Sequence, residues 1–365
     1  MKALTVGGAM LDTIAIIADD RIERMTMLNA DTSFLLLEEG RKTEAVEIST
    51  HVGGGAVNAA VAMSRLGLDV STLVKLGRDQ RAETILSHLM REGISTRWVL
   101  RDGRAPTGAS VMVSSHDRNA AIFTFRGANT LLQEADLKDD AFGVEVVYIS
   151  SLSNESADTF PAIVARANAQ GALIAANPRV RQLSSRGAAF QETLAKIDIL
   201  AVNSAEADVL VPGLVGRYGE GGHSLPLAPG EKPPRLVARG FVAGGLEMSL
   251  AAFFEALSNI GPRYVVVTDG RNGAFLGTRD AIHYCPAVLE TNVMGTAGAG
   301  DAFNATFTAA IALGRKPEEA LRAASVNAAA VVRYSDTQSG LLPCEEIDVE
   351  VAAREEQLSV RTWSH

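Results

Sequence analysis

Short apolar segments alternate with amphipathic segments along most of the chain. The apolar segments are rich in Val, Ile, Leu and Ala and end at small or polar residues, which is typical of buried strands. These predicted strands cover residues 3–8, 70–77, 144–151, 172–177, 198–203 and 263–270. The segments between them carry apolar residues at every third or fourth position and close on a glycine. This pattern predicts helices over residues 56–67, 82–93, 157–171 and 250–261. Alternating strands and helices favour a mostly parallel sheet with helices on both faces.

Two segments interrupt this alternation. Residues 32–50 and 107–127 each contain two extended runs around a polar turn, so we expect two hairpins. We expect them to pair as a small separate sheet that covers a ligand; two ordinary edge hairpins are the alternative. Residues 212–240 are rich in Gly and Pro and exceed the length of about 15 residues beyond which loops are uncommon. A flexible insertion, an oligomer contact and part of a site all remain open for them.

Composition narrows the class of protein. The 365 residues are 47% hydrophobic, which suffices for a large core, and the formal net charge is −9. With Lys and Arg scattered, this charge argues against a general affinity for nucleic acid or an anionic membrane. Cys285 and Cys344 form no Cys-x-x-Cys pair, and the six histidines show no metal-ligand spacing. The N-terminus lacks signal-peptide features, and no apolar run approaches the roughly 20 residues of a membrane span, so we expect a cytoplasmic protein.

A loop of small residues precedes the apolar helix predicted after residue 300. The sequence GTAGAGDAFNATF at residues 295–307 continues as an apolar run, and Gly314 is the predicted stop. The loop residues 297–300 therefore lead into a helix N-terminus, whose unpaired amides and dipole favour an anion such as phosphate. Asp301 lies in the first turn of that helix. Spacing alone leaves two interpretations of Asp301, a general base for an attacking hydroxyl or an acidic residue that only stabilises the helix.

Two motifs carry a resemblance to a known family. GTAGAGDAF at residues 295–303 resembles D-T-x-G-A-G-D-x-F, the C-terminal signature of the ribokinase-like (PfkB) carbohydrate and nucleoside kinases. GGGAVNAAVAMSRLG at residues 53–67 resembles their N-terminal signature, G-G-x-x-x-N-x-A…L-G. The resemblance implies one ribokinase-like α/β domain over residues 1–355. In this three-layer sandwich, helices cover both faces of a mostly parallel sheet, and a small β-sheet lid comes from about residues 13–51 and 107–127.

The same resemblance implies roles for individual residues. Asp301 would deprotonate the acceptor hydroxyl, beside an anion hole for the transferred phosphate formed by the amides of Ala297, Gly298, Ala299 and Gly300. Contacts with the acceptor are implied for Asp12, Gly54, Gly55 and Asn58. Contacts with the nucleotide are implied for Asn203, Glu206, Thr268, Gly270, Gly273 and Asn327. ATP and Mg²⁺ are the expected cofactors, with Glu206 holding Mg²⁺ through water, because Mg²⁺ loses its water reluctantly.

Several of these contacts have purely structural alternatives. Asp12 and Asn58 can cap a turn and a helix, and Glu206 can be a solvated residue at a helix start. On the lid, Phe125 and Arg126 are candidates for acceptor contact, although both side chains can merely pack or meet solvent. An arginine there would suit an acidic sugar.

One position departs from the family signature. Gly295 stands where the family usually has an Asp that helps to form a monovalent-cation site. Activation by K⁺ is therefore in doubt, whereas the proposed base and anion hole are unaffected.

We expect a kinase that phosphorylates a small sugar. A nucleoside such as adenosine or inosine is the alternative acceptor, and a non-catalytic ligand-binding protein on a kinase fold is the remote alternative. Other enzyme classes fail on the motifs, since Asn58 stands at the third glycine of a dinucleotide-binding fingerprint and Pro226 at the last glycine of a nucleophile elbow. No P-loop sequence G-x-x-x-x-G-K-[ST] occurs either. Because lids of this type can pair between subunits, we also expect a homodimer.

Overall fold

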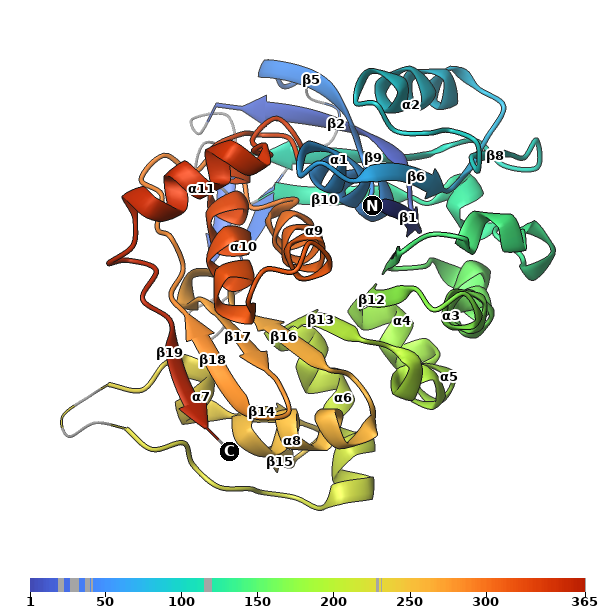
Figure 1. The fold of residues 1–365 in the computed structure, drawn as a ribbon. Coiled ribbons are helices and arrows are strands. Elements are labelled where there is room, and N and C mark those ends of the chain that lie inside the picture. Colours follow the sequence, from blue (N-terminus) through green and yellow to red (C-terminus); the bar gives the residue numbers. More distant parts are fainter. Residues whose placement is uncertain are drawn as a thin grey trace.

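The structure is a computed structural model that describes residues 1–18, 23–26, 33–36, 40, 42–114, 120–227, 230 and 232–364. Its centre is a nine-stranded sheet in the order β19-β18-β17-β16-β13-β12-β11-β1-β6 (Figure 1). The strands from β6 to β16 in this order are parallel, and β17, β18 and β19 are antiparallel. Their bounds are β1 (Lys2–Val6), β6 (Asp69–Leu73), β11 (Val146–Ser150), β12 (Leu173–Asn177), β13 (Ile199–Asn203), β16 (Tyr264–Thr268), β17 (Ala274–Gly277), β18 (Ala281–Cys285) and β19 (Arg361–Ser364).

Helices cover both faces of this sheet and create two hydrophobic cores (Figure 1). Alternate residues of each central strand enter opposite cores; in β11, for example, Val146 and Tyr148 enter one and Val147 and Ile149 the other. This is why the strands read as continuous apolar runs. One core is formed with α1 (Gly55–Arg65), α2 (Gln80–Arg91), α9 (Ala299–Ala312), α10 (Pro317–Val331) and α11 (Cys344–Ala353). The other is formed with α3 (Phe160–Ala169), α4 (Val180–Ser185), α5 (Gly187–Thr193), α6 (Ser204–Tyr218), α7 (Arg235–Arg239) and α8 (Leu250–Ile260).

The lid is a separate four-stranded sheet in the order β10-β9-β2-β5. Its strands are β2 (Met10–Ile17), β5 (Ala45–Gly53), β9 (Gly108–Ser114) and β10 (Ala120–Phe125). The hairpin predicted over residues 107–127 is confirmed by the antiparallel pairing of β9 with β10; its turn, residues 115–119, lies outside the described residues.

The hairpin predicted over residues 32–50 is wrong. β5 pairs with β2, whereas β4 (Ser33–Leu36) pairs with β3 (Glu23–Thr26) in a different sheet. The reason is that β2, which follows β1 directly, is a longer strand than β4. β5 therefore pairs with β2, although β4 is nearer to it in the sequence. Parts of the predicted lid segment, residues 19–22, 27–32, 37–39 and 41, lie outside the described residues.

The Gly/Pro-rich segment is shorter than residues 212–240. α6 continues through Pro212 to Tyr218, and α7 begins at Arg235. The hairpin of β14 (Phe241–Ala243) and β15 (Leu246–Met248) follows. The sheet also extends beyond the predicted domain end at residue 355, because β19 pairs with β18 and its buried Trp363 donates its indole N–H to the carbonyl of Pro226 at 2.8 Å. In the described ranges no helix is both long enough and apolar enough to cross a membrane.

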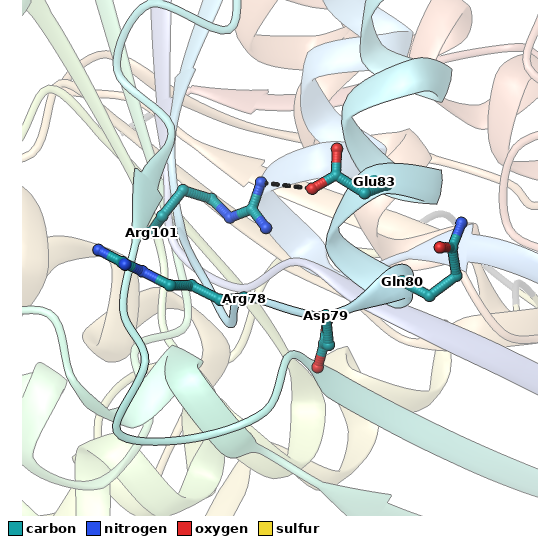
Figure 2. Close-up of a pocket in the computed structure, with 5 residues that line it drawn as sticks. All are labelled: Arg78, Asp79, Gln80, Glu83 and Arg101. Carbon is teal, nitrogen blue, oxygen red and sulfur yellow. Dashed lines mark hydrogen bonds and ion pairs between the residues drawn. The ribbon is translucent and has the colours of Figure 1, made fainter.

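Asp79 connects α2 to the start of the lid strand β9. Its carboxylate caps α2 by accepting from the Ala82 N–H at 3.1 Å, and it accepts from the N–H and hydroxyl of Thr107 at 2.8 and 2.7 Å. Figure 2 shows Asp79 in a pocket near the short pairing of β7 (Lys75–Leu76) with β8 (Leu100–Arg101). The Arg101–Glu83 ion pair, at 2.8 Å, lies in the same pocket. The predicted site residues lie elsewhere in the structure, so we interpret these contacts as structural. They hold the start of the lid strand β9 against the start of α2.

Candidate active site

The start of α9 presents free amides to open space. Gly298 precedes the helix with a φ of 82°, a left-handed conformation that glycine adopts without strain. The N–H groups of Gly300 and Asp301 have no acceptor among the described residues. A Cβ placed on Gly300 would meet no atom within 4 Å. The arrangement therefore fits an anion at this helix end.

The carboxylate of Asp301 is buried beside these amides, with both oxygens hydrogen-bonded. Arg179 Nη2 lies 2.9 Å from Oδ1, and Asn58 Nδ2 donates to Oδ2 at 2.9 Å. The side chain of Arg179 is 52% exposed, whereas that of Asp301 is 7% exposed. The negative charge of Asp301 is the main cause that raises the pKa of Arg179. The crevice therefore contains a carboxylate with a permanent positive charge at its open side.

Asn58 orients Asp301 and is itself held in place. Its side-chain oxygen accepts from Thr337 Oγ1 at 2.9 Å and from Gln338 Nε2 at 2.8 Å. This leaves its NH₂ group facing Asp301. The N-cap of α1 is Gly54, so the alternative that Asn58 caps this helix is wrong. Gly54 itself has a φ of 99°, and a Cβ there would lie 2.6 Å from the carbonyl oxygen of Gly8.

The inner face of the lid brings Asp12 to the same crevice. Asp12 is buried, pairs in register with Ser110 and His51, and accepts a hydrogen bond from the Ser110 hydroxyl. Burial raises the pKa of the Asp12 carboxyl, and the charge of Asp301 acts in the same direction. Gly55 also faces the crevice, since its Cβ would lie 3.8 Å from Asp301 Oδ1.

Most of the predicted nucleotide residues gather at the ends of β13 and β16. Asn203 and Thr268 are paired in register, and Gly270 and Gly273 flank the turn that follows β16. Glu206 lies in the first turn of α6, where it forms a capping box with Asn203, so the helix-start part of the alternative is confirmed; its side chain is buried, so the solvated part is wrong. Its carboxylate accepts from the Asn203 N–H at 2.9 Å. Burial raises the pKa of Glu206, whereas this hydrogen bond and the positive charge of Arg179 act in the opposite direction. In the described part of the chain, no three His, Cys, Asp or Glu side chains gather in a way that would hold a metal ion directly.

Two residues with predicted ligand contacts face away from the crevice or are enclosed by protein. Asn327 is fully buried, donates to Thr306 Oγ1 at 2.7 Å and accepts from the Leu342 N–H at 2.9 Å, so its amide ties α10 to neighbouring elements. Phe125 pairs with Ala109, the neighbour of Ser110 in β9. Side chains alternate along a strand, so Phe125 lies on the lid face opposite Asp12.

Three residues of the crevice were missed. Arg179 follows β12, and Tyr148 and Ser150 lie on β11, where their buried hydroxyls have no partner among the described residues. Burial and the charge of Asp301 raise the pKa of Tyr148. The rule that ligand groups follow the carboxyl ends of parallel strands could have identified Arg179 and Ser150.

The raised pKa of Asp12 makes a prediction about stability. A group whose pKa is raised by folding contributes stability below the ordinary carboxyl pKa of about 3.9, and this contribution is lost as the pH rises through the folded-state pKa. Asp12→Asn removes the buried charge, so at neutral pH it should raise the melting temperature by on the order of 2 °C. Thermal melts near neutral pH and near pH 4 test this, since the difference should shrink at acid pH. A variant that melts below the wild type at neutral pH would contradict the assignment.

Comparisons with known proteins agree with this geometry. The sequence matches the pfkB family of carbohydrate kinases over residues 23–214 and 243–344, which is more than half of the chain. The deoxyribokinase of Salmonella typhi is 25% identical over 338 residues, covering 92% of this chain and 97% of that protein.

Solved structures share the ribokinase-like fold. The nucleoside kinase of Methanocaldococcus jannaschii superposes with a TM-score of 0.72 at 18% identity, covering 97% of this chain and 99% of that one. A ribokinase of Arabidopsis thaliana, complexed with ribose and ATP, gives a TM-score of 0.69 at 19% identity, covering 96% of this chain and 99% of that one. The expected fold is thereby confirmed. The family match also spans the lid strand β5, Asn58, Arg179 and Asp301, and the protein accordingly belongs to the pfkB family of carbohydrate kinases and is a sugar kinase.

Proposed function

We propose that the protein transfers the γ-phosphate of ATP to a hydroxyl, most simply a primary one, of a small sugar. The observation that carries this proposal is the buried, doubly hydrogen-bonded Asp301 beside the free amides of α9. A carboxylate next to an anion-binding helix end combines the two groups that hydroxyl phosphorylation requires.

In the proposed reaction, the acceptor oxygen forms a bond to the γ-phosphorus while the bond from that phosphorus to the β–γ bridging oxygen breaks. Asp301 accepts the hydroxyl proton, and ADP leaves with the electron pair. The amides of Ala297, Gly298 and Gly300 would meet the negative charge on the transferred group, together with that of Ala299 once it leaves the Thr296 carbonyl, to which it donates at 3.4 Å. Arg179 adds a positive charge at the same point. Asn58 acts as a positioning residue, because its contact fixes one oxygen of the base.

The ends of β13 and β16 suit the nucleotide. Asn203, Thr268 and the following glycines offer polar groups and close backbone approach at one edge of the sheet. Mg²⁺ keeps most of its water and binds through phosphate oxygens, so one carboxylate that contacts this water is sufficient. Glu206 would hold Mg²⁺ through water from this edge, and bound ATP would supply the phosphoryl group.

The inner lid face suits the hydroxyl groups of a sugar. This face offers the carboxylate of Asp12 with the neighbouring Ser110 and His51, and such donors and acceptors match a polyol. A nucleoside needs an apolar pocket for its base; Phe123 and Phe125 lie on the opposite lid face, whereas Ile14, Met112 and Ile122 lie on the same face as Asp12. The deoxyribokinase relative supports the sugar, whereas the nucleoside kinase with a similar fold keeps the nucleoside as a second candidate.

ADP release with a panel of sugars and nucleosides tests the proposal. Thermal shifts with a nonhydrolysable ATP analogue provide a second measurement, because a ligand that binds the folded state stabilises it by mass action. A sugar that both raises the melting temperature and supports ADP release is the expected result. Release with nucleosides alone would favour the second candidate.

Asp301→Asn should lower kcat by about 10²–10⁴-fold, because it removes the general base. KM for ATP and for the acceptor should change much less, since the loss concerns the transition state. Steady-state kinetics measure both, and Asp158→Asn, at an exposed aspartate, is the matched control. If kcat of Asp301→Asn stays within about threefold of the wild-type value, Asp301 is not the general base and only stabilises the helix.

Activity should respond only weakly to K⁺. A Cβ on Gly295 would lie 3.6 Å from the carbonyl oxygen of Tyr334 and 3.7 Å from that of Ser335, so the backbone oxygens are present but the carboxylate at residue 295 is missing. Gly295→Asp should therefore increase the response. Rates in KCl against choline chloride give the comparison, and strong, saturable activation of the wild type would disprove the argument.

We expect a homodimer through the outer face of the lid. Ile48, Val111, Phe123 and Phe125 lie on the face opposite Asp12 and are 67%, 44%, 60% and 51% exposed. Exposed apolar groups gathered on one face are typical of an interface. Light scattering should give twice the chain mass of 38.5 kDa for the wild type and the chain mass for Phe123→Asp. A monomeric wild type would contradict this expectation.

A further inference from the structure

Three arginines meet at the edge of the crevice, and the reaction proposed above uses only one of them. Arg126 follows the lid strand β10, and Arg179 and Arg181 follow β12. Arg126 spans from the lid to the main sheet, where its Nη1 donates to the hydroxyl of Ser153 at 2.8 Å, just after β11. The N–H of Leu152, next to Ser153, donates to Oε1 of Gln182 at 2.9 Å, so the segment that holds Arg126 contacts the segment that carries Arg179 and Arg181. In agreement with this contact, burial and the charges of Arg181 and Arg179 lower the pKa of Arg126.

This positive cluster is not neutralised within the protein. Arg179 pairs with Asp301, but Arg126 and Arg181 have no carboxylate partner among the described residues. Several other arginines have a carboxylate partner, such as Arg65 with Glu92 and Arg315 with Asp348. Like charges held together without a counter-ion destabilise the folded state, and the formal net charge of −9 makes such a cluster unexpected. An anionic ligand would remove this repulsion.

The position of Arg126 indicates which ligand carries the anion. The sheet order at this edge is β1-β11-β12-β13-β16, with the nucleotide residues at β13 and β16. Neighbouring strands are about 4.8 Å apart, so Ser153 at β11 lies roughly 10–14 Å from those strand ends. Arg126 instead follows directly on the lid sheet that carries Asp12. Arg126 is therefore on the acceptor side, with Arg181 beside it.

We propose that the acceptor is a sugar acid, whose carboxylate is bound by Arg126 and Arg181 while Asp12 binds its hydroxyl groups. This inference rests on the proposed sugar kinase function and specifies its substrate class. The guanidinium fork of arginine matches a carboxylate with two parallel hydrogen bonds. A sugar phosphate shares this chemistry, so the experiment must separate the two sources of negative charge.

Acceptor pairs that differ in charge provide the test. ADP release is measured with D-ribose against D-ribonate, D-glucose against D-gluconate, and D-fructose against D-fructose 6-phosphate. We expect kcat/KM for a sugar acid to exceed that of its neutral partner by at least about tenfold, the effect of one charged hydrogen bond. Thermal shifts with the same compounds report binding without turnover.

Variants of Arg126 then test whether this residue causes the preference for the sugar acid. Arg126→Gln should lower kcat/KM for the sugar acid by about 10–100-fold, mainly through KM, and leave the neutral partner and the KM of ATP nearly unchanged. Arg126→Lys should retain part of the preference, because it keeps the charge but loses the fork. Arg91→Gln, at an exposed arginine on α2, is the matched control. The Arg126 side chain loses one hydrogen bond, to Ser153, in these variants, so they should fold, and their melting temperatures check this.

The outcomes separate the two proposals. Equal use of acidic and neutral sugars, or an equal loss for both in Arg126→Gln, would overturn the sugar-acid inference and leave the kinase function intact. A raised KM for ATP in Arg126→Gln would show that the arginines bind the nucleotide, and this would overturn the sugar-acid inference. A preference for the sugar phosphate over the sugar acid would overturn it as well. A sugar acid that stabilises the wild type more than Arg126→Gln, without ADP release, would support the inference and contradict the proposed kinase function.

Discussion

The burial of one carboxylate, that of Asp301, is the constraint on which the rest of the crevice depends. A buried charge is costly unless it is paired and hydrogen-bonded. Asp301 meets this requirement through Arg179 and Asn58, and Asn58 is held in turn by Thr337 and Gln338. The network joins α1, the segment after β12, the start of α9 and the segment before α11. Segments far apart in the sequence are thus fixed relative to one carboxylate.

Other groups in the crevice are less well satisfied, and this also bears on function. The hydroxyls of Tyr148 and Ser150 are buried without a partner in the described structure, and Arg126 lies against two further positive charges. Each arrangement costs free energy in the free protein. Such costs concentrate at functional sites, where a ligand supplies the missing partners. Here they lie between the lid and the start of α9, where the proposed reaction brings the acceptor to Asp301.

The two faces of the lid sheet present different residues. Alternation along β9 and β10 directs Ser110 to the crevice and Val111, with its partner Phe123, to the opposite face. The inner face therefore combines the polar Asp12 and Ser110 with the apolar Ile14 and Met112, whereas the outer face exposes Val111 and Phe123. The sequence alone shows two extended runs with Phe and Arg near their end, and it does not assign faces, because a shift of register by one residue exchanges them.

The sequence by itself determined the parallel sheet, the helices on both faces, the small-residue start of α9 and the position of Asp301 in its first turn, because each depends on residues close together in the chain. Hydrophobic periodicity and a glycine-rich helix start are local signals. Tertiary structure alone decided that β5 pairs with β2, that Phe125 lies on the lid face opposite Asp12, that Asn327 is enclosed by protein, and that Arg179 and Arg126 lie at the crevice. These outcomes depend on which distant segments pack together. Strand partners and charge clusters arise from long-range register and burial, and no short stretch of sequence records either one.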